Sequence, residues 1–94
     1  MLMKASDPTA LTQRHRQLVH SEFMKVVSHV QRDSGDWISN TLMLEGHSVA
    51  FKYKRKQRYQ SLKGARVNLT YYADVESVAG FEVEVMKVVR IKRS

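Results

Sequence analysis

The chain has 94 residues, enough for one compact domain, and its 43% hydrophobic and 27% charged residues are typical of a globular protein. It contains no cysteine, which excludes a disulfide framework, a thiolate metal site and a cysteine nucleophile and suits a reducing cytoplasm. The net charge of +7 favours a polyanionic partner, while short apolar runs and a start unlike a signal peptide argue against membrane insertion or secretion.

The first third of the chain has the spacing of a helix. Residues 1–10 show no period that could bury a face, so we expect a flexible arm there and one compact α+β domain over residues 11–94. Asp7 and Pro8 are typical of a helix start, because Asp accepts hydrogen bonds from the first free amides and proline loses nothing at the first position. Apolar residues then recur mostly three or four positions apart, at Leu11, Leu18, Val19, Phe23, Val26, Val27 and Val30. This pattern predicts a helix over residues 8–32, ended by Gly35.

An alternative makes residues 22–31 a first strand, because valine favours strands. The adjacent pair Val26 and Val27 speaks against it, since strict alternation is broken there. If this segment is nevertheless extended, the chain has five strands in an order similar to that of an oligonucleotide-binding (OB) barrel. The similarity is one of element order only, and no family-specific motif accompanies it.

Beyond Gly35 the pattern is that of strands. Residues 37–44 and 49–56 flank a turn at Glu45-Gly46-His47 and predict a hairpin, whose second strand alternates apolar residues with lysines. Residues 66–72 predict a third strand, residues 73–80 a connection, and residues 81–93 a final strand with Phe81, Val83, Val85, Val89 and Ile91 on one face. We therefore predict an α+β fold, in which one N-terminal helix precedes a four-stranded antiparallel sheet or small barrel, with the five-stranded OB-like barrel as the alternative.

The positive charge is concentrated in one segment. Residues 52–66 hold seven of the sixteen cations and no acid. On a strand, Lys52, Lys54, Lys56 and Arg58 would project from one face, and neighbouring members would be roughly 6.5 to 7 Å apart, which is twice the rise per residue. This distance is close to the phosphate spacing along a nucleic-acid strand. The simpler interpretation is that these lysines only keep a sheet face or an edge strand soluble.

Tyrosines lie among these charges and could stack on unpaired bases. Tyr59 and Tyr72 are better placed for stacking than Tyr53 and Tyr71, which share the parity of the predicted core. A second basic cluster closes the chain, although Glu82 and Glu84 on the same strand could pair with the lysine row and weaken polyanion binding. The candidate nucleic-acid contacts are Lys52, Lys54, Arg55, Lys56, Arg58, Tyr59, Lys63, Arg66, Tyr72, Arg90 and Lys92.

Catalytic signals are absent from the sequence. It contains no glycine-rich phosphate loop, no Gly-x-Ser-x-Gly elbow and no His-x-Glu deaminase pattern, and the carboxylate pairs lie amid no other catalytic group. The four histidines lack metal-site spacing, and Trp37 is typical of a core anchor. We therefore expect no enzymatic activity, no cofactor and no metal.

These observations predict a module that binds single-stranded DNA or RNA through its lysine-rich sheet face. Duplex is less favoured, because one long helix does not make a helix-turn-helix. The alternative is a protein-interaction module, including a homodimer, that binds an acidic partner through the sheet edge or the helix. Exposure of Leu11 and Leu18 would favour it. A small-molecule or anion binder inside a barrel has no specific sequence feature.

Overall fold

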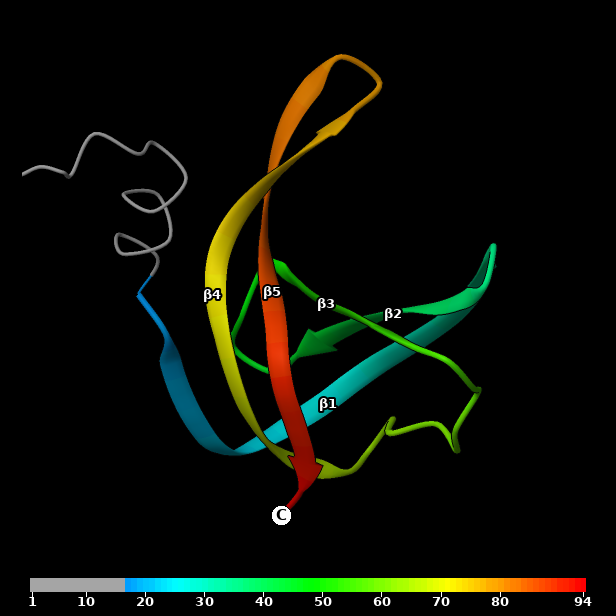
Figure 1. Ribbon diagram of the computed structural model, residues 1–94. Coiled ribbons are helices and arrows are strands. Elements are labelled where there is room, and N and C mark those ends of the chain that lie inside the picture. The colour runs from blue at the N-terminus through cyan, green and yellow to red at the C-terminus, as the bar shows by residue number, and fades with distance from the viewer. Residues whose placement is uncertain (1–16) are drawn as a thin grey trace, which may run out of the picture.

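The computed structural model describes residues 17–94, and these form a closed barrel of five strands with no helix. The strands are β1 (Val19–Ser34), β2 (Trp37–Leu44), β3 (Ala50–Arg55), β4 (Arg66–Val78) and β5 (Phe81–Arg93), and they follow one another around the barrel in the order β1-β2-β3-β5-β4 (Figure 1). The predicted α+β fold is therefore wrong, and the five-stranded barrel given as its alternative fits. The arm expected over residues 1–10 and the predicted helix start, with Leu11, lie outside the described residues.

The helix predicted over residues 8–32 is corrected to a strand from Val19 onward, and two irregularities in β1 explain the error. The register shifts between Ser21 and Met24 against β4, and it shifts again between Val26 and Ser28 against β2. Each shift adds an unpaired residue, which bends the strand and changes which face its neighbours occupy. Val26 is fully buried, whereas Val30, which would share its face in a regular strand, is 43% exposed.

The long, bent strand β1 pairs with two neighbouring strands. The first half of β1 pairs antiparallel with β4 and the second half with β2, so β1 passes from one side of the barrel to the other. Phe23 lies in the first irregularity with φ of 61°, a left-handed conformation that is costly for a bulky residue. Its amide donates to the Asn68 side chain at 2.9 Å, and the Arg66 guanidinium donates to its carbonyl at 3.0 Å.

The barrel closes through a parallel pairing of β3 with β5, whereas the sequence predicted only antiparallel strands. This ladder has three residue pairs, from Ala50 with Val85 to Lys52 with Lys87. The hairpin of β2 and β3 is confirmed, with Leu42 opposite Phe51.

The core fills the barrel with the inward residues of the alternating strands. Phe51 and Tyr71 meet edge to face, with ring centroids 4.9 Å apart. The predicted inward face of residues 66–72 is confirmed, since all three of its apolar members are buried. The buried cluster consists of Val26, Leu42, Leu44, Phe51, Val67, Leu69 and Tyr71.

Two hairpins extend from the barrel, β1–β2 and β4–β5 (Figure 1). The connection predicted over residues 73–80 is instead strand as far as Val78, and the β4–β5 turn occupies Ala79 and Gly80. The predicted apolar face of the last strand is only partly formed, because Val85 is buried and Ile91 packs on the core while Phe81, Val83 and Val89 are exposed. Met86 and Val88, which were not predicted on this face, also pack on the core. Within residues 17–94 the structure contains no helix that is long and apolar enough to cross a membrane.

Candidate nucleic-acid interface

The outer surface of β3 carries part of the predicted lysine row. The register places Lys52 opposite Thr41 and Lys54 opposite Ser39 on β2, while the intervening Tyr53 packs against the core. β3 ends at Arg55, so Lys56 and Arg58 belong to the connection to β4 and do not continue the row on a strand.

Three hollows of about 290, 270 and 260 Å³ lie on the side of the barrel formed by β3 and β5. Tyr53 lines all three, and each hollow shares at least three residues with the next, so we treat them as one surface and call it the basic track. Its only acid among the described residues is Glu76. Its cations come from β3 and β5 and are Lys52, Lys54, Arg55, Lys87, Arg90, Lys92 and Arg93.

Glu76 neutralises part of this charge. Its two carboxylate oxygens accept from Lys52 Nζ at 2.7 Å and from Lys87 Nζ at 2.5 Å. The two lysine hydrogen bonds lower the pKa of Glu76 to about 2. Cross-strand ion pairs with the lysine row therefore exist, but neither Glu82 nor Glu84 takes part in an ion pair within residues 17–94. The remaining five track cations form no ion pair with any described residue.

Four of the predicted contacts do not line the basic track. Lys56 lies over the Trp37 ring at 4.3 Å, and Arg58 pairs with Asp33 at 3.3 Å. Arg66 covers the Phe23 ring at 4.6 Å, and Lys63 is exposed in the connection between β3 and β4. Trp37 itself is 41% exposed rather than a core anchor. The track accordingly brings together Lys52, Lys54, Arg55, Tyr59, Tyr72, Arg90 and Lys92 of the predicted set.

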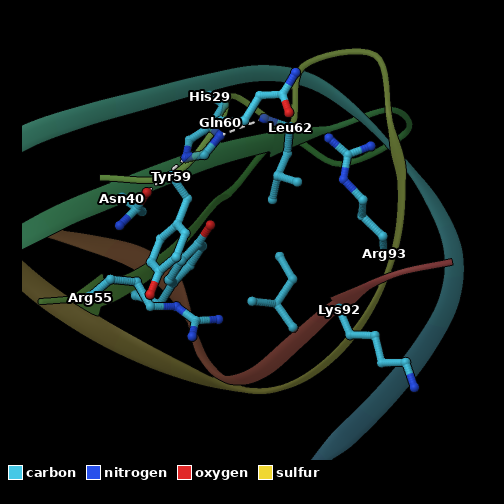
Figure 2. Close-up of a pocket in the computed structure, with 10 residues that line it drawn as sticks. His29, Asn40, Arg55, Tyr59, Gln60, Leu62, Lys92 and Arg93 are labelled. Carbon is cyan, nitrogen blue, oxygen red and sulfur yellow. Dashed lines mark hydrogen bonds between the residues drawn. The ribbon is translucent and has the colours of Figure 1, made fainter. Parts of the chain in front are cut away.

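The third hollow, which we call the barrel-mouth pocket, lies where the β3–β4 connection crosses the end of the barrel (Figure 2). Side chains of β1 hold this connection in place. The Leu62 amide donates to His29 Nδ1 at 2.9 Å, which leaves Nε2 as the donor to Asn40 Oδ1 at 2.7 Å. The Gln31 side chain donates to the Tyr59 carbonyl at 2.8 Å and accepts from its amide at 3.3 Å.

The two tyrosines of this pocket differ in burial. Tyr59 is 60% exposed, as stacking on a ligand requires, whereas Tyr53 is half-buried with Arg55 lying 5.4 Å from its ring centroid. Burial raises the pKa of Tyr53, and the positive charge of Arg55 opposes that rise only in part. Tyr53 is therefore a neutral aromatic wall at physiological pH.

Sequence reasoning missed Lys87 and Arg93 as contacts, and it missed the polar groups of the barrel mouth, His29, Asn40 and Gln60. One signal was available for Asn40, which shares the parity of Leu42 and Leu44 and is therefore a polar residue at an inward position. Nothing local marks Gln60, whose placement depends on how the connection folds back on β1.

No three His, Asp or Glu side chains of residues 17–94 gather as a potential metal site. Comparisons of this chain with protein-family models, with curated proteins and with solved structures found no match. The case for a function therefore rests on the geometry of the basic track.

Proposed function

We propose that the protein binds single-stranded nucleic acid along the basic track. The observation that carries the proposal is the concentration of seven cations and one acid around three adjoining hollows, on a five-stranded barrel similar in architecture to an OB barrel. Lysine and arginine neutralise the phosphates, and tyrosines at the same surface stack on bases that a duplex would keep paired. Tyr72 lines one end of the track and Tyr59 the other.

The unpaired cations set the expected salt dependence. Five cations of the track form no ion pair with a described residue, and each phosphate contact on a single strand contributes about −0.7 to the slope of log K against log salt. We therefore expect a slope of about −3.5 in fluorescence-anisotropy titrations of labelled single strands, with weaker binding to a duplex of the same sequence. A salt-independent response would contradict the proposal.

Two charge-matched variants distinguish the track from general basicity. Changing Lys54, Arg55, Arg90 and Arg93 together to Gln removes four track cations, so the slope should fall to about −0.7 and the affinity should fall more than tenfold. The control variant changes four cations outside the track, Lys25, Arg32, Lys56 and Arg58, to Gln. Equal losses in both variants would mean that net charge, rather than this surface, drives binding.

A protein-interaction role is the second candidate, because apolar side chains are exposed on the described surface. Leu18 is 59% exposed, and Phe81 and Val78 are exposed beside the β4–β5 turn. Size-exclusion chromatography with light scattering tests its simplest form, a homodimer, and Phe81→Ser should then shift the mass toward the monomer. A monomer at every concentration would exclude that form.

A further inference from the structure

We propose that the barrel-mouth pocket binds one unpaired nucleobase together with its phosphate, so that a single nucleotide of the bound strand is held inside the barrel end while its neighbours lie along the track. This inference rests on the proposed function and adds a specific site to it. It predicts that one position of a bound strand contributes more than the others.

The size and walls of the pocket suit a single base. Its volume is about 260 Å³, smaller than the roughly 300–1,000 Å³ typical of pockets for drug-sized ligands. Two tyrosine rings and two aliphatic side chains, Leu62 and Ile91, contribute its apolar lining. A flat aromatic heterocycle gains from such walls by stacking and by loss of apolar contact with water.

Polar groups at the inner end match the edge of a base. Asn40 is 2% exposed, and its Oδ1 is already occupied by His29 Nε2. One hydrogen of its amino group goes to the Ile38 carbonyl at 3.1 Å, and we assign the second hydrogen to an acceptor on the base. The Gln60 side chain also lines the pocket and can donate and accept.

Cations at the rim of the pocket can bind the phosphate of the nucleotide. Arg55 and Arg93 line the pocket, and no acid does. In Figure 2 the Arg55 guanidinium lies near the Tyr59 hydroxyl end and Arg93 extends along the opposite wall, whereas the Lys92 side chain points away from the pocket. A base in the pocket would thus have a guanidinium on either side for its phosphate.

The pocket is formed before any ligand arrives. Two hydrogen bonds with the Gln31 side-chain amide fix the backbone of Tyr59, and His29 fixes that of Leu62 three residues later. An exposed aromatic ring on a tethered backbone loses little conformational entropy when it stacks on a base, which favours affinity. The hydrogen bonds from β1 therefore hold the β3–β4 connection in place and also preorganise the pocket for its ligand.

An abasic scan tests the proposal. A labelled single strand of about eight nucleotides, within the range that one OB-type barrel covers, is prepared with one abasic residue at each position in turn. We expect one position at which loss of the base weakens binding about tenfold, and about twofold or less elsewhere. Tyr59→Ala should make the abasic strand bind as well as the intact one, while Tyr59→Phe retains the ring and the position dependence.

A matched variant and a second probe separate the two levels of the proposal. Tyr72→Ala removes a tyrosine at the other end of the track, so it should lower affinity but keep the dependence on the abasic position.

In ¹⁵N spectra, adenosine and cytidine monophosphates should shift the side-chain amide signals of Asn40 and Gln60. A uniform abasic profile with intact binding overturns the pocket and leaves the proposed function standing. Nucleotide shifts in the pocket without oligonucleotide binding support the pocket and overturn the proposed function.

Discussion

Glu76 is the one acid of the basic track among the described residues, and the Lys52 and Lys87 ammonium groups hold its carboxylate. Its pKa falls from 4.5 to about 2 in the folded protein, so the ionised form is stabilised by folding. The stability that it contributes is fully present above pH 4.5 and is lost as the pH falls toward 2. Glu76→Gln should lower the free energy of unfolding at pH 7 by about 1 kcal/mol and remove this part of the acid dependence, as urea titrations at several pH values would measure. An unchanged acid profile would contradict the assignment.

The same substitution should strengthen nucleic-acid binding. Removing the carboxylate releases two lysines that line the track, and two further phosphate contacts would steepen the salt slope by about 1.4. Glu84→Gln provides the control, since this substitution changes the net charge as much as Glu76→Gln does and Glu84 does not line the track. Equal gains from both substitutions would show a general charge effect. Glu76 would then favour stability without a specific effect on affinity.

At the scale of the element, the β4–β5 turn has a residue unsuited to its conformation. Ala79 has φ of 50° and Gly80 has φ of 84°, both left-handed, in a two-residue hairpin turn that favours Asn-Gly. Asn tolerates this region better than Ala, so Ala79→Asn should raise the free energy of unfolding by about 0.5–1 kcal/mol. Ser77→Asn on the same hairpin, within a strand, should give no gain. A neutral or destabilising Ala79→Asn would contradict the turn geometry.

The error over β1 shows where periodicity fails as a guide. Val19, Phe23, Val26 and Val30 follow helical spacing, yet only Val26 of these four is buried, and two register shifts interrupt the strand that carries them. Local spacing cannot distinguish these cases, since the shifts depend on partners far along the chain. β2, β3 and the first half of β4 were predictable because each has one buried face and therefore alternates.

Residues 73–80 were predicted as a connection, and this prediction was wrong because the hairpin extends beyond the core. Beyond the barrel the hairpin buries neither face completely, so Val75, Val78 and Phe81 remain exposed. Small and acidic residues there are typical of a connection, and only the pairing with β5 makes them extended.

At the scale of the whole molecule, charge was easier to locate than geometry. The basic run of residues 52–66 was visible in the sequence, and three of its members, Lys52, Lys54 and Arg55, line the track on β3. On β5, Arg90 and Lys92 were also predicted, whereas Lys87 was not, because its place beside Lys52 depends on the parallel closure. Likewise the barrel mouth combines residues from β1, β2, β3, β5 and the β3–β4 connection, which no local pattern relates.

That parallel closure is also the weakest seam of the barrel. β3 and β5 share three residue pairs, whereas β4 and β5 share twelve, and two hollows of the track adjoin the seam. A short ladder next to solvent opens at a lower free-energy cost than a long one. We therefore expect the amides that bond across the seam to exchange hydrogen faster than those between Val67 and Tyr71 in β4, as measured by NMR.

Binding should reverse this order if the ligand spans the seam. A nucleic-acid strand in contact with Lys54 on β3 and Arg90 on β5 would connect these two β-strands. Opening the seam would then require releasing the ligand. Saturating single-stranded DNA should slow exchange at the seam about tenfold or more, and the variant with Gln at Lys54, Arg55, Arg90 and Arg93 should lose this protection. Seam amides that already exchange as slowly as those of β4 in the free protein would show that the barrel closes as firmly there as elsewhere.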